Sequence, residues 1–291
     1  MSTTINKSIF AVLLVVSMLS QLNSNAQEPL TPASSGYAPV NGAKVYYEVY
    51  GTGDPIVLLH GAFMTINSNW GELIPILSKT RKVIALELDG HGHTPLSQRP
   101  LNHQTMASDV ASVMKYLKID SADILGYSYG GTIAYKFAIQ HPDKTKKLII
   151  ISSVYKTEGW MELIPAAFAS FTPEIFDDSP LRSEYNKVAT DTSSWHKFIG
   201  KMLEFIKVKF NLGDDNIKNI KAPVLLIMGD NDGTDKKVLA ETYSLLGGNV
   251  VGDFAGIPKS QLAILPGKTH VTLMSDTQAI AALVGYFLGT K

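Results

Sequence analysis

The chain has 291 residues and no cysteine, and its 26 lysines and arginines balance its 26 aspartates and glutamates. The absence of cysteine excludes disulfides, thiolate metal sites, a cysteine nucleophile and a lipidated cysteine. The balanced charge gives no reason to expect nucleic acid or an anionic membrane surface as a partner.

The first residues have the pattern of a secretory signal. Lys7 supplies a positive charge, Ile9 to Leu19 is almost entirely apolar, and Ser24 and Ala26 are small residues of the kind that a signal peptidase reads. The apolar run is too short to cross a bilayer, which takes about 20 residues. We predict that residues 1–26 are a cleaved signal peptide and that the mature protein is secreted or periplasmic, without stable membrane association. A membrane anchor or a buried helix is the alternative.

After a lead rich in proline, serine and glycine, short apolar runs alternate with helical patterns. Strands are expected where apolar and β-branched residues cluster between turns, and helices where apolar residues recur at helical spacing. The expected strands are Ala43–Tyr50, Ile56–Leu59, Lys82–Leu88, Ala122–Leu125, Lys147–Ser152, Pro223–Met228 and Gln261–Leu265. The expected helices are Trp70–Ser78, Gln104–Leu117, Thr132–Gln140, Asp235–Leu246 and Thr277–Leu288. This alternation predicts an α/β fold with a mostly parallel sheet covered by helices on both faces.

The alternation stops between about Val154 and Ile220. No strand is expected there, and tryptophan, phenylalanine and methionine recur at loosely helical intervals. The segment is therefore expected to be a helical insertion between the strands Lys147–Ser152 and Pro223–Met228.

The motif Gly126-x-Ser128-x-Gly130 stands between an expected strand and an expected helix. In a nucleophile elbow this context holds the serine in a strained conformation, and the residues two before and two after it must lack a Cβ atom. We predict that Ser128 is the nucleophile. The alternatives are an idle serine in a glycine-rich turn and a phosphate-binding loop. The missing lysine argues against the second of these.

A serine hydroxyl needs a base to accept its proton. With an elbow serine, the acid and then the histidine follow the nucleophile in the chain. Of seven histidines only His141, His196 and His270 follow Ser128. His270 lies on the loop after the last expected strand, at the end of the sheet where catalytic groups gather, so we predict it as the base.

The acid should precede His270 and also follow a strand. Gly229-Asp230-Asn231-Asp232 directly follows the expected strand Pro223–Met228. A carboxylate there can fix the tautomer of the histidine and stabilise the imidazolium ion. We predict Asp232 because it lies further out on the loop, with Asp230 as the alternative. Asp235 is expected in the first turn of the next helix.

Two backbone amides should form an oxyanion hole. Tyr129, which follows the nucleophile and begins a helix, should supply one of them. The loop His60-Gly61-Ala62-Phe63 should supply the other, from Ala62 as first choice and from Phe63 as second. The histidines at positions 60, 91 and 93 are expected to brace loops rather than to act as catalysts.

These motifs together resemble the α/β-hydrolase superfamily. The residues that carry the resemblance are His60-Gly61, Asp89-x-x-Gly92-x-Thr94, Gly126-Tyr127-Ser128-Tyr129-Gly130-Gly131, Gly229-x-x-Asp232 and Pro266-Gly267-x-x-His270. The branch that they resemble is that of the small capped serine hydrolases, which includes esterases, C–C bond hydrolases and cofactor-free haloperoxidases. The resemblance covers about residues 40–290.

The resemblance implies an α/β-hydrolase fold whose acid is Asp232. It divides the mature chain into a core domain of residues 27–153 and 221–291 and a helical cap of residues 154–220. Members with an aspartate nucleophile are dehalogenases and epoxide hydrolases, and Ser128 argues against both activities. The glycine-rich stretch from Gly247 to Ser260 departs from the family pattern and has no assigned role.

The chemistry predicted from these residues is hydrolysis of a small, largely apolar carboxylic ester through an acyl-enzyme, without a cofactor or a metal. Amide or C–C hydrolysis, acyl transfer and perhydrolysis could use the same triad, and a ligand-binding sensor with a retained triad is a third alternative. Substrate contacts are expected from Phe63 and from the aromatic residues of the insertion, Trp160 and Phe171 among them.

Overall fold

A computed structural model describes residues 30–289. The predicted signal peptide, residues 1–26, lies outside this range. Within the range, no helix has the length and apolar character that a membrane crossing requires.

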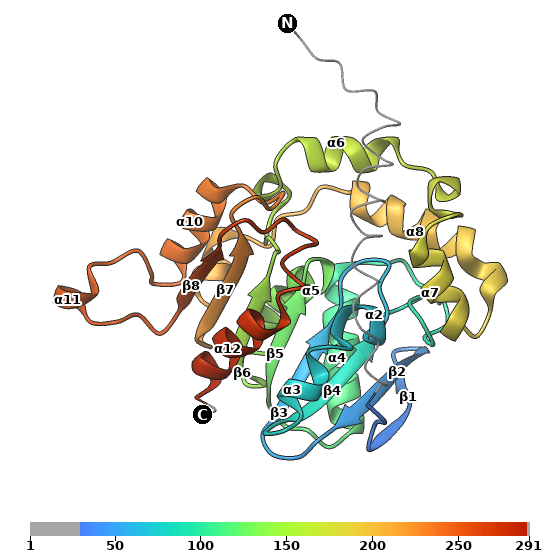
Figure 1. The fold of residues 1–291 in the computed structure, drawn as a ribbon, viewed down its shortest axis with the longest axis horizontal. Helices are drawn as coiled ribbons and strands as arrows, with labels where there is room; N and C mark the ends of the chain where they lie inside the picture. The colour runs from blue at the N-terminus through green and yellow to red at the C-terminus, as the bar shows by residue number, and fades with distance from the viewer. Residues whose placement is uncertain (1–29, 290–291) are drawn as a thin grey trace, which may run out of the picture.

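An eight-stranded sheet forms the centre of the molecule, with strands in the order β1-β2-β4-β3-β5-β6-β7-β8 (Figure 1). Strands β3 to β8 run parallel, whereas β1 and β2 are antiparallel to their neighbours. The sheet is therefore mostly parallel, as predicted. Its strands are β1 (Ser34–Val40), β2 (Ala43–Tyr50), β3 (Pro55–Leu59), β4 (Lys82–Glu87), β5 (Ala122–Tyr127), β6 (Thr145–Ile151), β7 (Val224–Gly229) and β8 (Gln261–Leu265).

Helices cover both faces of the sheet because the central strands are apolar on both sides. Along β3, Val57 and Leu59 point into one apolar cluster, while Ile56 and Leu58 point into the other. The first cluster contains residues of α4 (His103–Tyr116), α5 (Tyr129–Gln140) and α10 (Lys236–Leu245), and the second contains residues of α2 (Ile66–Trp70), α3 (Ile74–Leu77) and α12 (Thr277–Leu288). Burying both faces in this way is what a parallel sheet requires.

The helix expected over Trp70–Ser78 is replaced by two short helices. Thr65 caps the first of them, α2, with its side chain, so that this helix starts before the expected segment. Pro75 lies in the first turn of α3, where its missing amide hydrogen is tolerated. The apolar spacing predicted a single helix, but the proline at the start of α3 separates it from α2.

The segment from residue 154 to residue 220 is helical and contains none of the sheet's strands. It consists of η1 (Thr157–Gly159), α6 (Leu163–Ser170), η2 (Pro173–Phe176), α7 (Pro180–Val188), η3 (Thr192–Ser194), α8 (Trp195–Lys207) and α9 (Asp214–Lys218). Figure 1 shows α6 and α8 lying above the sheet. Trp195, Phe198 and Met202 form a buried face on α8 and join the insertion to the apolar cluster of the core.

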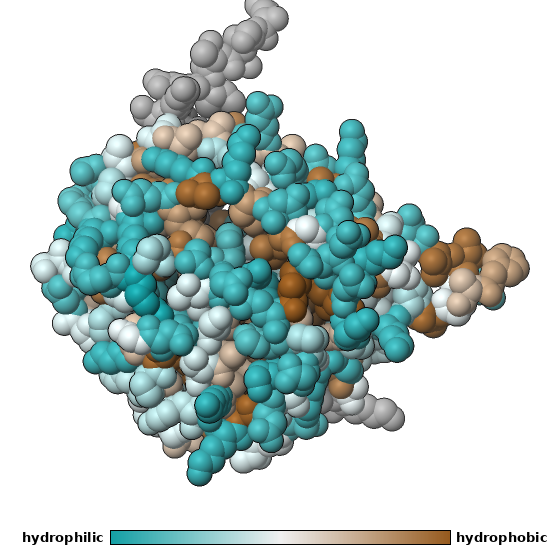
Figure 2. Space-filling model, turned by 180° about the vertical axis from the view of Figure 1, so that it is seen from behind, coloured by the Kyte–Doolittle hydropathy of each residue, from teal (hydrophilic) through white to brown (hydrophobic). Residues whose placement is uncertain are grey.

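The stretch from Gly247 to Ser260 projects from the body of the molecule, with α11 (Gly252–Ala255) at its tip (Figure 1). Phe254 and Ile257 are 92% and 88% exposed. Figure 2 shows this apolar projection from the other side of the molecule. It directly precedes β8, the outer strand of the sheet.

Candidate active site

Ser128 occupies the tight turn between β5 and α5, in a strained conformation with φ 52° and ψ −117°. Non-glycine residues rarely adopt a positive φ. A Cβ atom on Gly126 would come within 2.3 Å of the carbonyl oxygen of Gly130, and one on Gly130 within 2.1 Å of the carbonyl oxygen of Leu59. Both glycines are thus needed for the strand and helix to approach each other, and the turn has the geometry of a nucleophile elbow.

The structure brings the three predicted triad residues together. The Oγ atom of Ser128 lies 2.9 Å from Nε2 of His270, and Nδ1 of His270 lies 3.1 Å from Oδ1 of Asp232. The three residues come from loops after β5, β7 and β8, so the carboxyl ends of parallel strands assemble the site. The side chain of Asp232 is fully buried while that of His270 is 27% exposed, which leaves the imidazole accessible to a ligand.

Asp232 is held as a carboxylate despite its burial. Burial alone would raise its pKa, but the charge and hydrogen bond of His270, with help from Ser152 and the Thr234 amide, bring the pKa below its ordinary value. Its Oδ2 atom and the hydroxyl of Ser152 are both buried, and neither has a hydrogen bond of good geometry. Ser152 thus contributes to the lowered pKa of the acid.

The alternative acid, Asp230, lies elsewhere. It is exposed, and its Oδ1 accepts hydrogen bonds from the backbone amide of Lys268 at 3.1 Å and from the side chain of Asn231 at 2.8 Å. It therefore joins the two loops that carry Asp232 and His270 without touching the imidazole. Asp235 caps α10 by accepting from the amide of Lys237, which agrees with its expected place at the start of that helix.

The amides of the predicted oxyanion hole differ in their availability. Phe63 donates its amide to Nε2 of His91 at 3.1 Å, and Gly61 donates its amide to Asn69 at 2.7 Å. Within the part of the chain that the structure describes, the amides of Ala62 and Tyr129 donate to no group. The second choice, Phe63, is therefore occupied as a donor, whereas the first choice and Tyr129 are free to bind a ligand oxygen.

His60 and His91 hold this loop in place. Both are buried, and each accepts a backbone amide at Nε2: His60 from Leu88 at 3.0 Å, and His91 from Phe63. Their Nδ1 atoms lie against the carbonyl oxygens of Gly61 and Asp89, so each ring carries its proton on Nδ1. Burial lowers the pKa of both rings and keeps them neutral. This bonding fits the loop-bracing role predicted for them.

A third histidine of this region, His93, pairs with the buried carboxylate of Glu87 at 2.9 Å. The hydrogen bond that His93 donates to Glu87 raises the pKa of His93. Glu87 is the last residue of β4 and also accepts the backbone amide of His93, so His93 braces the loop after β4, as expected.

The predicted substrate-contact residues lie at different distances from the triad. The ring of Trp160 meets that of His270 edge to face at 5.7 Å. Phe171 is buried and packs on Phe176, which in turn packs on Phe63 of the oxyanion loop. Trp160 thus borders the site directly, whereas Phe171 reaches it only through other rings.

The sequence reasoning missed one residue of the site. Tyr127 precedes the nucleophile, its hydroxyl donates to the carbonyl oxygen of His270 at 2.9 Å, and its ring stacks on the imidazole. Its place inside the elbow motif was the available signal, but that motif constrains only the glycines and the serine.

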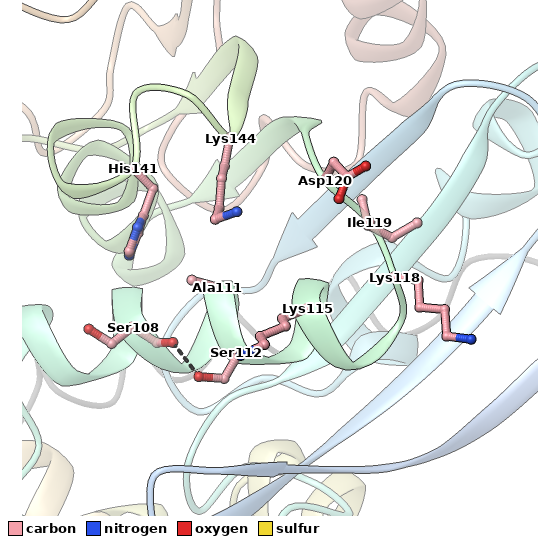
Figure 3. A pocket seen from close by; sticks show the side chains of 9 residues that line it. All are labelled: Ser108, Ala111, Ser112, Lys115, Lys118, Ile119, Asp120, His141 and Lys144. Carbon is pink, nitrogen blue, oxygen red and sulfur yellow. Dashed lines mark hydrogen bonds between the residues drawn. The ribbon is translucent and has the colours of Figure 1, made fainter.

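A pocket of about 370 Å³ lies at the other end of the sheet and contains no triad residue. Its walls come from α4, from the loop between α4 and β5, and from the loop between α5 and β6. Figure 3 shows His141 and Lys144 on one side of it and Ser108 and Ser112 on the other. This places His141 away from the site, as predicted. His196 also lies away from it and pairs with Asp177 in the insertion.

Comparisons with known proteins agree with this geometry. The family model of the alpha/beta hydrolase fold matches residues 54–190. The soluble epoxide hydrolase of Corynebacterium sp. (strain C12) is 32% identical over 117 residues, which are 40% of this chain and 41% of that protein. The 2-hydroxymuconate semialdehyde hydrolase of Pseudomonas sp. (strain CF600) is 35% identical over 109 residues, which are 35% of this chain and 38% of that protein.

A solved structure extends the likeness over the whole chain. The naproxen esterase (carboxylesterase NP) of Bacillus subtilis matches with a TM-score of 0.68 at 17% identity, covering 99% of this chain and 100% of that chain. At such low identity the likeness shows the fold alone.

The fold, the elbow and the strand-end residues define an α/β hydrolase. The chain has the α/β-hydrolase fold, and the family model of that fold matches residues 54–190. The chain matches about two fifths of the length of the first curated relatives. The activities of those relatives are therefore not assigned to this chain.

Proposed function

We propose that the protein is a serine hydrolase that cleaves small, largely apolar carboxylic esters through an acyl-enzyme. The observation that carries the proposal is the unbroken chain from Ser128 through His270 to the buried Asp232. The free amides of Ala62 and Tyr129 beside the elbow add to it. A nucleophile, a base, a group that orients the base and an oxyanion site are the parts that acyl transfer to serine requires.

The reaction proceeds in two halves. The Oγ atom of Ser128 attacks the ester carbonyl while Nε2 of His270 takes its proton, and Asp232 stabilises the imidazolium ion. The amides of Ala62 and Tyr129 hold the negative oxygen of the tetrahedral intermediate. The carbon–oxygen bond to the leaving group then breaks, and His270 gives its proton to the departing alcohol. In the second half His270 deprotonates a water molecule, which attacks the acyl carbon. The bond from that carbon to Oγ of Ser128 then breaks, His270 returns the proton to Oγ, and the acid is released.

The aromatic surroundings favour an apolar substrate. Trp160 borders the imidazole, and the rings of Phe63, Phe176 and Phe171 form a continuous series from the oxyanion loop into the insertion. Apolar walls with few polar groups are typical of sites for small uncharged molecules. We therefore propose an ester without charged groups near its carbonyl.

The relative from Pseudomonas keeps a second candidate open, because its name is that of a semialdehyde hydrolase rather than an esterase. Cleavage of a C–C bond beside a carbonyl could use the same triad and the same oxyanion amides. The epoxide hydrolase relative is a weaker guide to activity, because Ser128 stands where the resemblance expects aspartate for that chemistry.

The test is covalent labelling followed by turnover. A fluorophosphonate probe should add one adduct to the intact protein, and Ser128→Ala should abolish it. A panel of esters, amides and diketones then separates ester hydrolysis from amide and C–C cleavage. Labelling that survives Ser128→Ala would refute the nucleophile, and labelling without turnover of any panel member would favour the sensor alternative.

We also propose that the protein is exported and loses residues 1–26, on the strength of Lys7, the apolar run and Ala26. Cell fractionation with N-terminal sequencing of the purified protein tests this. A mature chain that begins at Gln27 outside the cytoplasm is expected, and a protein that keeps Met1 and stays with the membrane would contradict the proposal.

A further inference from the structure

The backbone of Ser128 is bonded to the end of a neighbouring strand. Its amide donates to the carbonyl oxygen of Ile151 at 2.9 Å, and its carbonyl oxygen accepts the hydroxyl of Ser153 at 2.6 Å. Ile151 is the last residue of β6, and Ser153 follows it by two residues. The end of β6 therefore binds both polar groups of the nucleophile's backbone, one on each side of its Cα atom.

These two bonds matter because Ser128 has a backbone conformation that few residues adopt. Its φ of 52° lies in the region that favours glycine. Such a conformation persists only where the surrounding structure fixes it. Helix α5 bonds to the same carbonyl oxygen through the amides of Gly131 and Thr132, at 2.9 and 3.2 Å. The hydroxyl of Ser153 adds a bond from a second element of the fold.

The hydrogen of the Ser153 hydroxyl has to be assigned, because Thr132 is also close to it. The two hydroxyl oxygens lie 3.1 Å apart, and that of Thr132 lies 2.9 Å from the carbonyl oxygen of Val154. Each hydroxyl has one hydrogen to donate. The contact from Ser153 to Ser128 is the shortest of the three. We therefore assign the hydrogen of Ser153 to Ser128 and that of Thr132 to Val154.

The hydroxyl of Ser153 has little freedom to leave this position. Ser153 is 5% exposed and Thr132 is 4% exposed. A Cβ atom on Gly131 would lie 2.4 Å from the Cβ atom of Ser153, so α5 packs directly onto this serine. Because a buried hydroxyl without a partner is costly, the bond to Ser128 should persist while the nucleophile reacts.

We propose that Ser153 is a positioning residue for the nucleophile. Its hydroxyl fixes the carbonyl of Ser128 and so keeps the Oγ atom of Ser128 aligned with His270. The proposal rests on the serine hydrolase function proposed above. Ser153 acts through the backbone of Ser128, so it should change the rate at which Oγ attacks and leave the affinity for the substrate unchanged.

Fluorophosphonate labelling of the purified protein at increasing probe concentration separates rate from affinity. Ser153→Ala should lower the limiting rate of labelling by roughly tenfold, less than the 10²-fold that a misplacement of about 1 Å can cost. The probe concentration that gives half of the limiting rate should not change. The pH at which labelling reaches half of its maximum should also stay as in the wild type, because His270 and Asp232 keep their contacts.

Thr145→Val is the matched control. Thr145 is buried at the opposite end of β6, and its hydroxyl donates to the carbonyl oxygen of His141 at 3.1 Å. Each of the two variants loses one hydrogen bond from a buried hydroxyl to a backbone carbonyl, so their Tm values should fall by similar amounts. Only Ser153→Ala should slow the labelling of Ser128.

Ser153→Cys tests the same bond with the site still filled, should the alanine variant fail to fold. A thiol is a weak donor, so the limiting rate of labelling in this variant should also lie below that of the wild type.

The outcomes separate the two proposals. A wild-type protein that the probe does not label refutes the proposed function. If the wild type is labelled, the function stands, and three results overturn the role of Ser153. They are an unchanged limiting rate in the Ser153 variants, a change confined to the half-saturating concentration, and an equal loss of rate in Thr145→Val.

Discussion

The hydroxyl of Tyr127 donates a 2.9 Å hydrogen bond to the backbone carbonyl oxygen of His270, and its ring stacks on the imidazole with centroids 5.2 Å apart. The residue just before the nucleophile thus holds the loop that carries the base. Because Tyr127 is buried, the bond is shielded from water. The elbow and the histidine loop, which lie far apart in the sequence, are joined at the point where a proton must pass between them.

Tyr127→Phe should therefore weaken catalysis without removing it. Loss of one such bond costs about 1 kcal/mol, which corresponds to roughly a fivefold fall in kcat if the cost falls on the transition state. The rate of fluorophosphonate labelling should fall by a similar factor, and the pH profile of kcat/KM should shift because the imidazole is less well placed. Unchanged kcat together with an unchanged pH profile would show that the bond only stabilises the fold.

Replacing the acid should be far more damaging. Asp232→Asn removes the charge that stabilises the imidazolium ion and can leave the imidazole in the wrong tautomer. The same change in a serine protease triad lowers kcat by about 10⁴-fold. Asp230→Asn is the control, since Asp230 is exposed and accepts hydrogen bonds from Gly267, Lys268 and Asn231 rather than from the imidazole. Its kcat should stay within a few-fold of the wild type. A larger loss in Asp230→Asn than in Asp232→Asn would reverse the assignment.

Phe171→Ala should act first on stability. Phe171 is 3% exposed and packs between Phe168 and Phe176. Truncating a buried phenylalanine typically costs about 3–5 kcal/mol, so Tm should fall by several degrees. KM should also rise, because Phe171 packs on Phe176, which packs against Phe63 of the oxyanion loop. Ile175→Ala is a suitable control, since Ile175 is exposed and lies in η2, shortly after Phe171 in the chain. A variant with normal Tm and altered KM would place Phe171 directly on the substrate.

The sequence was sufficient where local rules decide the structure. Ser128 stands in a turn whose glycines are required by close backbone contacts, and His270 follows the last strand of an alternating pattern. The strand β1 was missed because Ser34–Val40 mixes glycine and proline with apolar residues. Asn41-Gly42 after it, both with positive φ, is the standard signal for a tight hairpin and could have revealed the strand.

Contacts between distant segments were not predictable in this way. The bond from Tyr127 to His270 joins residues 143 positions apart. The position of Trp160 on the imidazole depends on the pairing of the insertion with the loop that carries Asp232. Neither relationship leaves a periodic pattern in the sequence, because each is set by how the insertion and the strand-end loops pack.

His103 lies where the core meets the insertion. His103 begins α4, and its ring packs against Phe205 at 4.8 Å and Phe210 at 4.6 Å, both from the insertion. Burial, reinforced by the charge of Lys136, lowers its pKa from 6.5 to about 4. The His103 ring therefore binds a proton less readily in the folded state than in the unfolded chain.

The sign of the pH effect follows from these two values. Above pH 6.5 the ring is neutral in both states, and its contribution to stability is fully present. Between pH 6.5 and about 4 only the unfolded state takes up the proton, so stability falls as the pH falls. His103→Phe keeps a ring against the two phenylalanines but cannot titrate. The difference in Tm between the variant and the wild type should therefore move in favour of the variant as the pH is lowered from 7 to 4. Thermal unfolding of both proteins across this range measures that difference, with the value at pH 7 as the reference, and parallel curves would show that His103 does not titrate between the two states.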